Sequence, residues 1–154
     1  MVDQSTESNR IKTSTVKPDE ETHINTLFDL TGRTALVTGA SGFLGQSLAR
    51  ALAEAGARVV VSSRKRKKAE EIAELLKGEA QGSHIGIELD HMDETSINAG
   101  FDEILDRVGS LEILVNNGNL ALGVDLTNVT GAEFQQQLGN ATGYFLLARR
   151  IRNW

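Results

Sequence analysis

The sequence predicts an α/β fold with a doubly wound parallel sheet, built from alternating elements as β-α-β-α-β-α-β-α. Apolar residues recur in turn at strand and at helix spacing along most of the chain. The run ARVVVSS at 57–63 has consecutive valines, which is typical of a strand buried on both faces of a parallel sheet. The segment VTGASGFLG at 37–45 places glycines between a strand and a helix, a junction at which such sheets bind ligands.

These periods give the order of the elements. The apolar run RTALVTG is bounded by glycine and is predicted as a buried strand, and Gly56 ends the helical period that follows it. The predicted strands are 33–39, 57–63, 84–90 and 111–117. The predicted helices are 43–57, 67–78, 94–109 and 131–151. Right-handed crossovers between parallel strands then predict the strand order 3-2-1-4, with helices on both faces.

Composition divides the chain and excludes several classes of protein. Residues 1–27 are polar and hold the only proline, so we expect a flexible N-terminal arm, followed by one domain at 28–154. The net charge of -5 disfavours nonspecific binding of nucleic acid. No apolar run approaches the ~20 residues that span a membrane. The chain has no cysteine, which excludes disulfides and fits a reducing compartment, so we expect a cytoplasmic protein.

The glycine-rich junction is the strongest functional signal. Gly39 allows a tight turn, Gly42 lets the backbone approach a phosphate, and Gly45 lets the helix pack closely on the sheet. Ser41 offers a hydroxyl donor, and free N–H groups at the helix start face a pyrophosphate. The predicted phosphate-binding residues are Gly39, Ser41, Gly42, Phe43, Leu44 and Gly45. The alternative is a glycine-rich turn without a ligand; a P-loop is excluded because no Gly-Lys-Ser/Thr follows.

Further motifs follow the later strands. Asp90 comes after the third strand, Asn116 and Asn117 end the fourth, and Asn140 lies in the fourth helix. Together with TGASGFLG at 38–45, these residues resemble the short-chain dehydrogenase/reductase family in order and spacing, over about Leu27 to Trp154. The resemblance implies a Rossmann-like NAD(P)-binding domain, of which 28–154 would be a part.

The glycine spacing departs from the family's common short form. That form reads TGxxxGxG, whereas this chain reads TGxxGxxG, the spacing of the extended branch, with Phe43 where a glycine is usual. The flanking stretches DLTGRTALVTG and ALAEAGARVVVSSR look more like the short form, so the offset is interpreted as a local variant. The offset alone favours a third interpretation, an extended-type relative acting on nucleotide sugars.

The end of the second strand predicts the coenzyme. NAD sites usually carry an acidic residue there, which accepts from the ribose 2′-OH. This chain has no carboxylate in VVVSSRKRKK; Ser63 and Arg64 hold the place, and Arg64 can pair with a 2′-phosphate in a fork. We therefore predict NADP(H) rather than NAD. Lys67 and Lys68 fit a solvated helix face better than a binding role, and a nucleic-acid role for RKRKK is disfavoured by the acidic chain.

The resemblance also implies contacts for the rest of the coenzyme. Asp90 would meet the adenine amino group, and His91 would act only through its backbone N–H on the ring. Asn117 and Gly118 would border the ribose, although this chain reads NNGN where the family reads NNAG. The alternatives are turn residues at both places, and Asp93 is the expected cap of the third helix.

The catalytic residues are mostly missing. The family uses a serine, a tyrosine with a lysine four residues later, and an asparagine that holds a water in a proton relay. Asn140 matches that asparagine, with an ordinary polar helix residue as the alternative. Tyr144 is the only tyrosine, Ala148 stands where the lysine would be, and Tyr144 is expected to pack beside Phe145 against the sheet. No histidine shows the spacing of a metal site.

Two functions from different classes remain. The first is the coenzyme-binding portion of an NADP-dependent short-chain oxidoreductase, inactive as given; the family resemblance implies a secondary alcohol or ketone as the substrate of the complete protein. The second is a noncatalytic NADP-binding sensor or interaction protein. The fourth strand would leave an unpaired edge, and GYFLLARRI at 143–151 would leave apolar residues unpartnered. We therefore expect marginal stability or a homo-oligomer.

Overall fold

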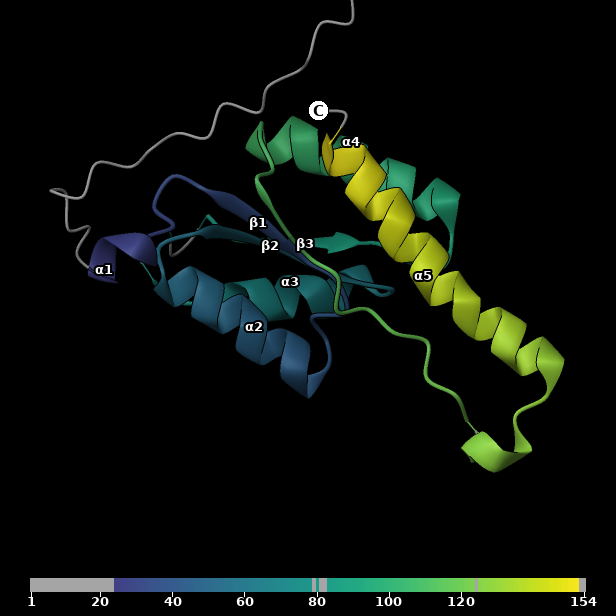
Figure 1. Cartoon of the computed structure of the whole chain (residues 1–154). Coiled ribbons are helices and arrows are strands. Elements are labelled where there is room, and N and C mark those ends of the chain that lie inside the picture. The colour runs from purple at the N-terminus through teal and green to yellow at the C-terminus, as the bar shows by residue number, and fades with distance from the viewer. Residues whose placement is uncertain (1–23, 79, 81–82, 124, 153–154) are drawn as a thin grey trace, which may run out of the picture.

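The computed structural model describes residues 24–78, 80, 83–123 and 125–152 and shows the parallel sheet (Figure 1). The strands are β1 (Thr34–Val37), β2 (Arg58–Ser63), β3 (Ile85–Glu88) and β4 (Ile113–Val115). They pair in parallel in the order β3-β2-β1-β4, so the predicted order is confirmed. Strand order reverses at β1, where Val37 pairs with Val61 of β2 and with Val115 of β4. In such sheets this reversal is where a ligand crevice opens.

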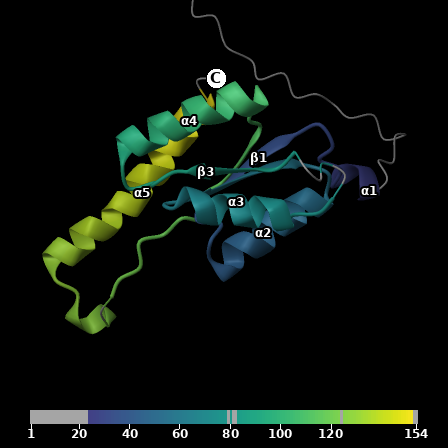
Figure 2. The ribbon, with the colours of Figure 1, turned by 180° about the vertical axis from the view of Figure 1, so that it is seen from behind.

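Helices cover both faces of the sheet, as predicted. The elements are α1 (Ile24–Leu27), α2 (Phe43–Glu54), α3 (Arg66–Leu75), α4 (Glu94–Val108), η1 (Leu126–Asn128, a 3-10 turn) and α5 (Gly131–Arg152). Figures 1 and 2 show α2 and α3 on one face and α4 and α5 on the other. Each helix that the periodicity predicts is present, with ends that differ by a few residues at most.

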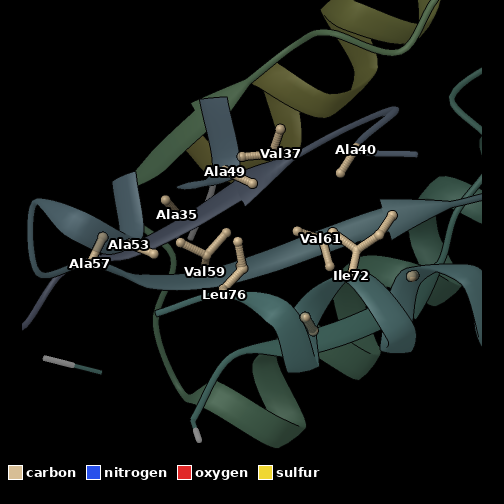
Figure 3. Close-up of a cluster of buried hydrophobic side chains, with 12 residues drawn as sticks. Ala35, Val37, Ala40, Ala49, Ala53, Ala57, Val59, Val61, Ile72 and Leu76 are labelled. Carbon is tan, nitrogen blue, oxygen red and sulfur yellow. The ribbon is translucent and has the colours of Figure 1, made fainter. Parts of the chain in front are cut away.

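β2 is buried on both faces, as its valines predict. Val59 and Val61 belong to the core cluster under α2 and α3, whereas Val60 belongs to the cluster on the opposite face. This division follows from the pleat, because successive side chains of a strand point to opposite faces. Figure 3 shows the first cluster, in which α2 contributes the small side chains Ala49 and Ala53. Small side chains let α2 lie close to the carboxyl end of β1.

The opposite core cluster is built from larger side chains. Ile97, Phe101 and Ile104 of α4 are fully or almost fully buried, and Leu147 of α5 joins them. Asp93 caps α4 as expected, since its Oδ1 accepts from the backbone N–H of Thr95 at 2.8 Å. This packing fixes α4 and α5 beside the loops that follow β3 and β4.

Two predictions about the ends of the domain stay predictions. Of the expected arm at 1–27, residues 1–23 lie outside the described residues, and Ile24–Leu27 form the short helix α1. Within the described chain β4 pairs with β1 alone, and its residues are only half-buried. An edge of this kind exposes backbone N–H and C=O groups, which is the physical basis for expecting self-association.

Candidate dinucleotide site

A cavity of about 840 Å³ lies at the carboxyl ends of the strands. The loops after β1, β2, β3 and β4 all contribute to its wall. Every residue predicted to bind coenzyme lines it, namely Gly39, Ser41, Gly42, Phe43, Leu44, Gly45, Ser63, Arg64, Asp90, His91, Asn117 and Gly118. Sequence elements far apart in the chain therefore meet at one crevice, while Asn140 is not among the lining residues.

The loop between β1 and α2 is built around its glycines. Gly39 has a φ of +62°, and a Cβ there would lie 2.6 Å from the Cα of Gly118. A Cβ at Gly45 would lie 2.5 Å from the carbonyl oxygen of Gly39 and 2.7 Å from Nδ2 of Asn117. At Gly42, by contrast, a Cβ would make only an ordinary contact of 3.7 Å. The protein's own packing thus requires glycine at 39 and 45, whereas glycine at 42 leaves room on the cavity side.

The start of α2 offers backbone donors to this cavity. Gly42 is the N-cap residue and makes no side-chain cap, and the first turn contains no acidic residue. The first backbone hydrogen bond of the helix runs from the N–H of Gln46 to the carbonyl of Gly42. Among the described residues, no hydrogen bond uses the N–H groups of Phe43 and Leu44. A helix start with free amides and a positive dipole end fits an anionic phosphate.

Thr38 and Asn117 hold the glycine loop against the end of β4. Oγ1 of Thr38 accepts from the N–H groups of Asn117 and Gly118 at 3.0 and 2.9 Å. Nδ2 of Asn117 donates to the carbonyls of Thr38 and Gly39 at 3.1 and 3.2 Å. The sequence interpretation placed Asn117 beside the ribose and did not single out Thr38. The threonine directly before the first glycine was the available sequence signal for these hydrogen bonds between the glycine loop and the end of β4.

The basic run at residues 64–68, after β2, contributes some side chains to the cavity and others to ion pairs on the surface. Arg64, Lys65 and Lys68 line the cavity. Arg66 instead forms a two-pronged ion pair with Glu103 of α4, with both N–O distances at 2.7 Å, and Lys67 lies 4.0 Å from Glu71. The placement of Lys68 was missed by the interpretation of this residue as part of a solvated face. Lys65 is the N-cap residue of α3 and Lys68 lies in the first turn of that helix, so both stand at the helix end nearest the cavity.

Two short side chains shape the cavity wall after β2 and β3. Ser63 is almost fully buried, and its Oγ accepts from the N–H of Lys65 at 3.3 Å. Asp90 forms a turn, in which its Oδ1 accepts from the N–H of Met92 at 2.9 Å. The backbone N–H of Asp90 donates to Oγ of Ser96 at 2.9 Å. Asp90 therefore serves the turn that was the alternative interpretation, while its adenine contact stays a prediction.

The side chain of His91 does more than its predicted backbone role. The imidazole is buried, and its Nε2 lies 2.9 Å from Oδ1 of Asn140 on α5. Asn140 is also buried and bonds the backbone of Leu120 through both ends of its amide. Tyr144 stacks on His91 with ring centroids 5.9 Å apart and donates to the carbonyl of Gly118 at 2.6 Å. α5 thus contacts the wall of the cavity through these side chains.

One packing expectation for α5 was wrong. Phe145 was expected to pack against the sheet beside Tyr144, but 63% of its surface is exposed. Successive helix positions differ by about 100°, so one face of α5 places Tyr144 on the loop while Phe145 points outward. The side chain of Arg149 lies over the Phe145 ring at 5.9 Å.

Fold and cavity together define a doubly wound α/β domain with a cavity at its switch point. A family model described as short chain dehydrogenase matches residues 33–153. The chain therefore belongs to the short chain dehydrogenase family. Within the described part of the chain, none of the helices combines the length and the hydropathy of a membrane-spanning segment.

Individual relatives agree with this assignment. The chain is 31% identical over 121 residues to the 3-oxoacyl-[acyl-carrier-protein] reductase FabG of Aquifex aeolicus, covering 78% of this chain and 49% of that protein. It is 31% identical over 133 residues to D-threitol dehydrogenase of Mycolicibacterium smegmatis, covering 86% and 51%. The chain thus spans about half the length of these relatives.

Solved structures show the same relationship. A gluconate 5-dehydrogenase from Burkholderia cenocepacia, solved with NADP and tartrate, superposes with a TM-score of 0.75 at 32% identity, covering 85% of this chain and 51% of that one. A 3-ketoacyl-(acyl-carrier-protein) reductase from Brucella melitensis, solved with NADH, gives a TM-score of 0.68 at 31% identity, covering 79% and 49%. The shared region is the fold described above.

Proposed function

We propose that this chain is the coenzyme-binding portion of an NADP(H)-dependent oxidoreductase that transfers hydride between the coenzyme and an alcohol or ketone. One observation carries the proposal. Free amides at the start of α2 and the cations Arg64, Lys65 and Lys68 line the same cavity at the switch point of the sheet. The named relatives are dehydrogenases and reductases, which favours an oxidoreductase over a noncatalytic sensor.

The lining residues fit the parts of the coenzyme in turn. The amides of Phe43 and Leu44, with the open side of Gly42, would hold the bridging phosphates. Asp90, His91, Asn117 and Gly118 also line the cavity. By the family resemblance, Asp90 and the N–H of His91 would contact the adenine, and Asn117 and Gly118 would border the ribose. When bound, the nicotinamide supplies or accepts the hydride.

The choice of NADP(H) over NAD rests on charge. In the described chain, Asp90 is the single carboxylate among the lining residues, and it follows β3 rather than β2. Arg64 directly follows β2, and neither it, Lys65 nor Lys68 forms an ion pair within the described residues. One such charge at ~4 Å contributes about 1 kcal/mol in water and about 4 in a shielded site. Even the smaller figure approaches a tenfold preference.

Calorimetric titration of the 154-residue chain with NADPH and, separately, with NADH tests this proposal. We expect NADPH to bind at least about tenfold more tightly than NADH at low salt. The difference should narrow as salt rises, because exposed charges are screened. Tighter binding of NADH would contradict the coenzyme assignment, and binding of neither would contradict the proposal as a whole.

The proposal assigns coenzyme binding, and not turnover, to these residues. Tyr144 is the only tyrosine, its hydroxyl is bonded to the carbonyl of Gly118, and Ala148 follows where a lysine would be needed. We therefore expect the chain to bind NADPH and to reduce no ketone. A Ser and a Tyr-x-x-x-Lys encoded in frame after Trp154 would support the oxidoreductase, and a stop codon would support the noncatalytic alternative. A cytoplasmic location and a homo-oligomer also stay predictions.

A further inference from the structure

The imidazole of His91 is enclosed between the loop after β4 and the helix α5. Only 9% of the residue is exposed. Its ring stacks on Tyr144 at an interplanar angle of 17°, and its Nε2 lies 2.9 Å from Oδ1 of Asn140. The coenzyme contact assigned to this position uses the backbone alone, so the proposed function leaves the side chain without a role.

The amide of Asn140 has one orientation, because Leu120 bonds both of its ends. Oδ1 accepts from the N–H of Leu120 at 2.8 Å, and Nδ2 donates to the carbonyl of Leu120 at 3.2 Å. Oδ1 can only accept, so Nε2 of His91 carries the proton in the bond between them.

The position of the ring is fixed from the other side as well. A Cβ at Gly143 of α5 would overlap the carbonyl oxygen of His91 and lie 3.3 Å from its ring. The α5 backbone therefore seats directly on His91, and the ring has no free space on that side. Tyr144, one residue later, donates its hydroxyl to the carbonyl of Gly118 at 2.6 Å.

Gly118 faces the same ring from the cavity loop. A Cβ on Gly118 would lie 3.0 Å from Nδ1 of His91 and 3.4 Å from two further ring atoms. A contact of 3.0 Å requires the neighbour to move, and Asn140 and Tyr144 hold this neighbour in place. Gly118 is also the position at which this chain departs from the alanine of NNAG. The buried ring of His91 thus leaves no room for the alanine that the family has at position 118.

We propose that His91 is a positioning residue: its imidazole, held by Asn140 and Tyr144, sets the loop 117–120 on the wall of the cavity, and this ring makes glycine necessary at 118. The consequence for coenzyme affinity rests on the proposed function. The coupling between positions 91 and 118 does not, because it is a property of the chain's own packing.

A double-mutant cycle of Gly118→Ala and His91→Ala tests the coupling. Two readouts are used: the hydrogen-exchange rate of the Leu120 amide in the chain alone, and the dissociation constant for NADPH. In the chain that keeps His91, we expect Gly118→Ala to raise the exchange rate and the dissociation constant about tenfold each, which is the scale of an overpacked contact. In the His91→Ala background the same change should alter either by less than about twofold. Gly123→Ala is the matched control, since a Cβ there meets nothing within 4 Å.

The outcomes separate the two proposals. Equal effects of Gly118→Ala in both backgrounds, or no effect in either, would overturn the positioning role. If the parent chain binds no NADPH, the proposed function fails, while the exchange cycle alone still decides this inference. Should Gly118→Ala fail to fold, His91→Ala by itself removes the imidazole that contacts the loop, and Tyr144→Phe, which keeps the ring stacked on His91, serves as its comparison. Faster exchange at Leu120 in His91→Ala with an unchanged melting temperature would support the inference, and unchanged exchange in that variant would overturn it.

Discussion

The two walls of the cavity that follow β1 and β2 are built on different principles. The wall after β1 consists of backbone, and Gly39 and Gly45 pack so tightly that a single Cβ would collide with neighbouring main chain. The wall after β2 consists of the buried Ser63 and of the exposed cations Arg64, Lys65 and Lys68. Steric fit therefore determines the first wall, and long-range charge determines the second.

The difference predicts how each wall responds to substitution. Main chain that is packed against main chain cannot yield, so a change there should affect folding and binding together. Exposed cations contribute through electrostatic attraction in water, so a change there should affect selectivity and leave the fold intact.

Gly39→Ala should have the largest effect. The new Cβ would lie 2.6 Å from the Cα of Gly118, and an L side chain is strained at a φ of +62°. We expect a loss of about 2–4 kcal/mol in the free energy of unfolding and no measurable NADPH binding. Urea denaturation and calorimetry measure the two quantities. Gly123→Ala serves as the control, and a Gly39→Ala chain as stable as that control would show that the first wall is not sterically determined.

Arg64→Ala should change selectivity alone. We expect NADPH affinity to fall about tenfold, NADH affinity to stay within about twofold, and the melting temperature to stay unchanged. Lys67→Ala is the matched control from the same basic run, because Lys67 faces Glu71 and does not line the cavity. Equal losses for both coenzymes would mean that Arg64 acts on the shared part of the dinucleotide. The contrast between the walls would then be wrong.

The same contrast explains what could be predicted from the sequence. Strand order, helix positions and the glycine junction follow from periodicity and spacing, which are properties of the local chain. The glycines at 39 and 45 were singled out by the same local spacing, although the atoms that a Cβ would meet there include those of Asn117 and Gly118 after β4. The sequence did not predict that Arg66 turns away from the cavity to form an ion pair, because its partner Glu103 lies a whole β-α unit further along the chain.

The contacts of α5 show the same limit. Asn140 was singled out by resemblance, but its bonds to Leu120 and His91 join segments that no local pattern connects. Whether His91 used its backbone or its imidazole depended on the space left by Gly118 and Gly143. Such complementarity becomes visible only once the three segments are placed in space.

Acid should weaken the edge of the sheet opposite both walls. His84, at the start of β3, accepts at Nδ1 from the N–H of Val59, and burial lowers the pKa of its imidazole below the ordinary 6.5. The unfolded chain then binds more protons than the folded one as pH falls through 6.5, so stability is complete above that pH and declines below it. Urea denaturation between pH 8 and pH 5 should show this decline, with a smaller slope for His84→Asn. An identical slope in the variant would exclude His84 as its cause.

The smallest effect is expected for Glu103→Gln, which tests how the basic run divides. The guanidinium of Arg66 lowers the pKa of the Glu103 carboxyl and binds both of its oxygens on the surface between α3 and α4. Loss of a partly exposed pair of this kind should lower the free energy of unfolding by about 1 kcal/mol or less. Because Arg66 does not line the cavity, the ratio of NADPH to NADH affinity should stay constant in paired titrations. A higher ratio would mean that the released Arg66 reaches the coenzyme, and that the ion pair with Glu103 limits the charge of the second wall.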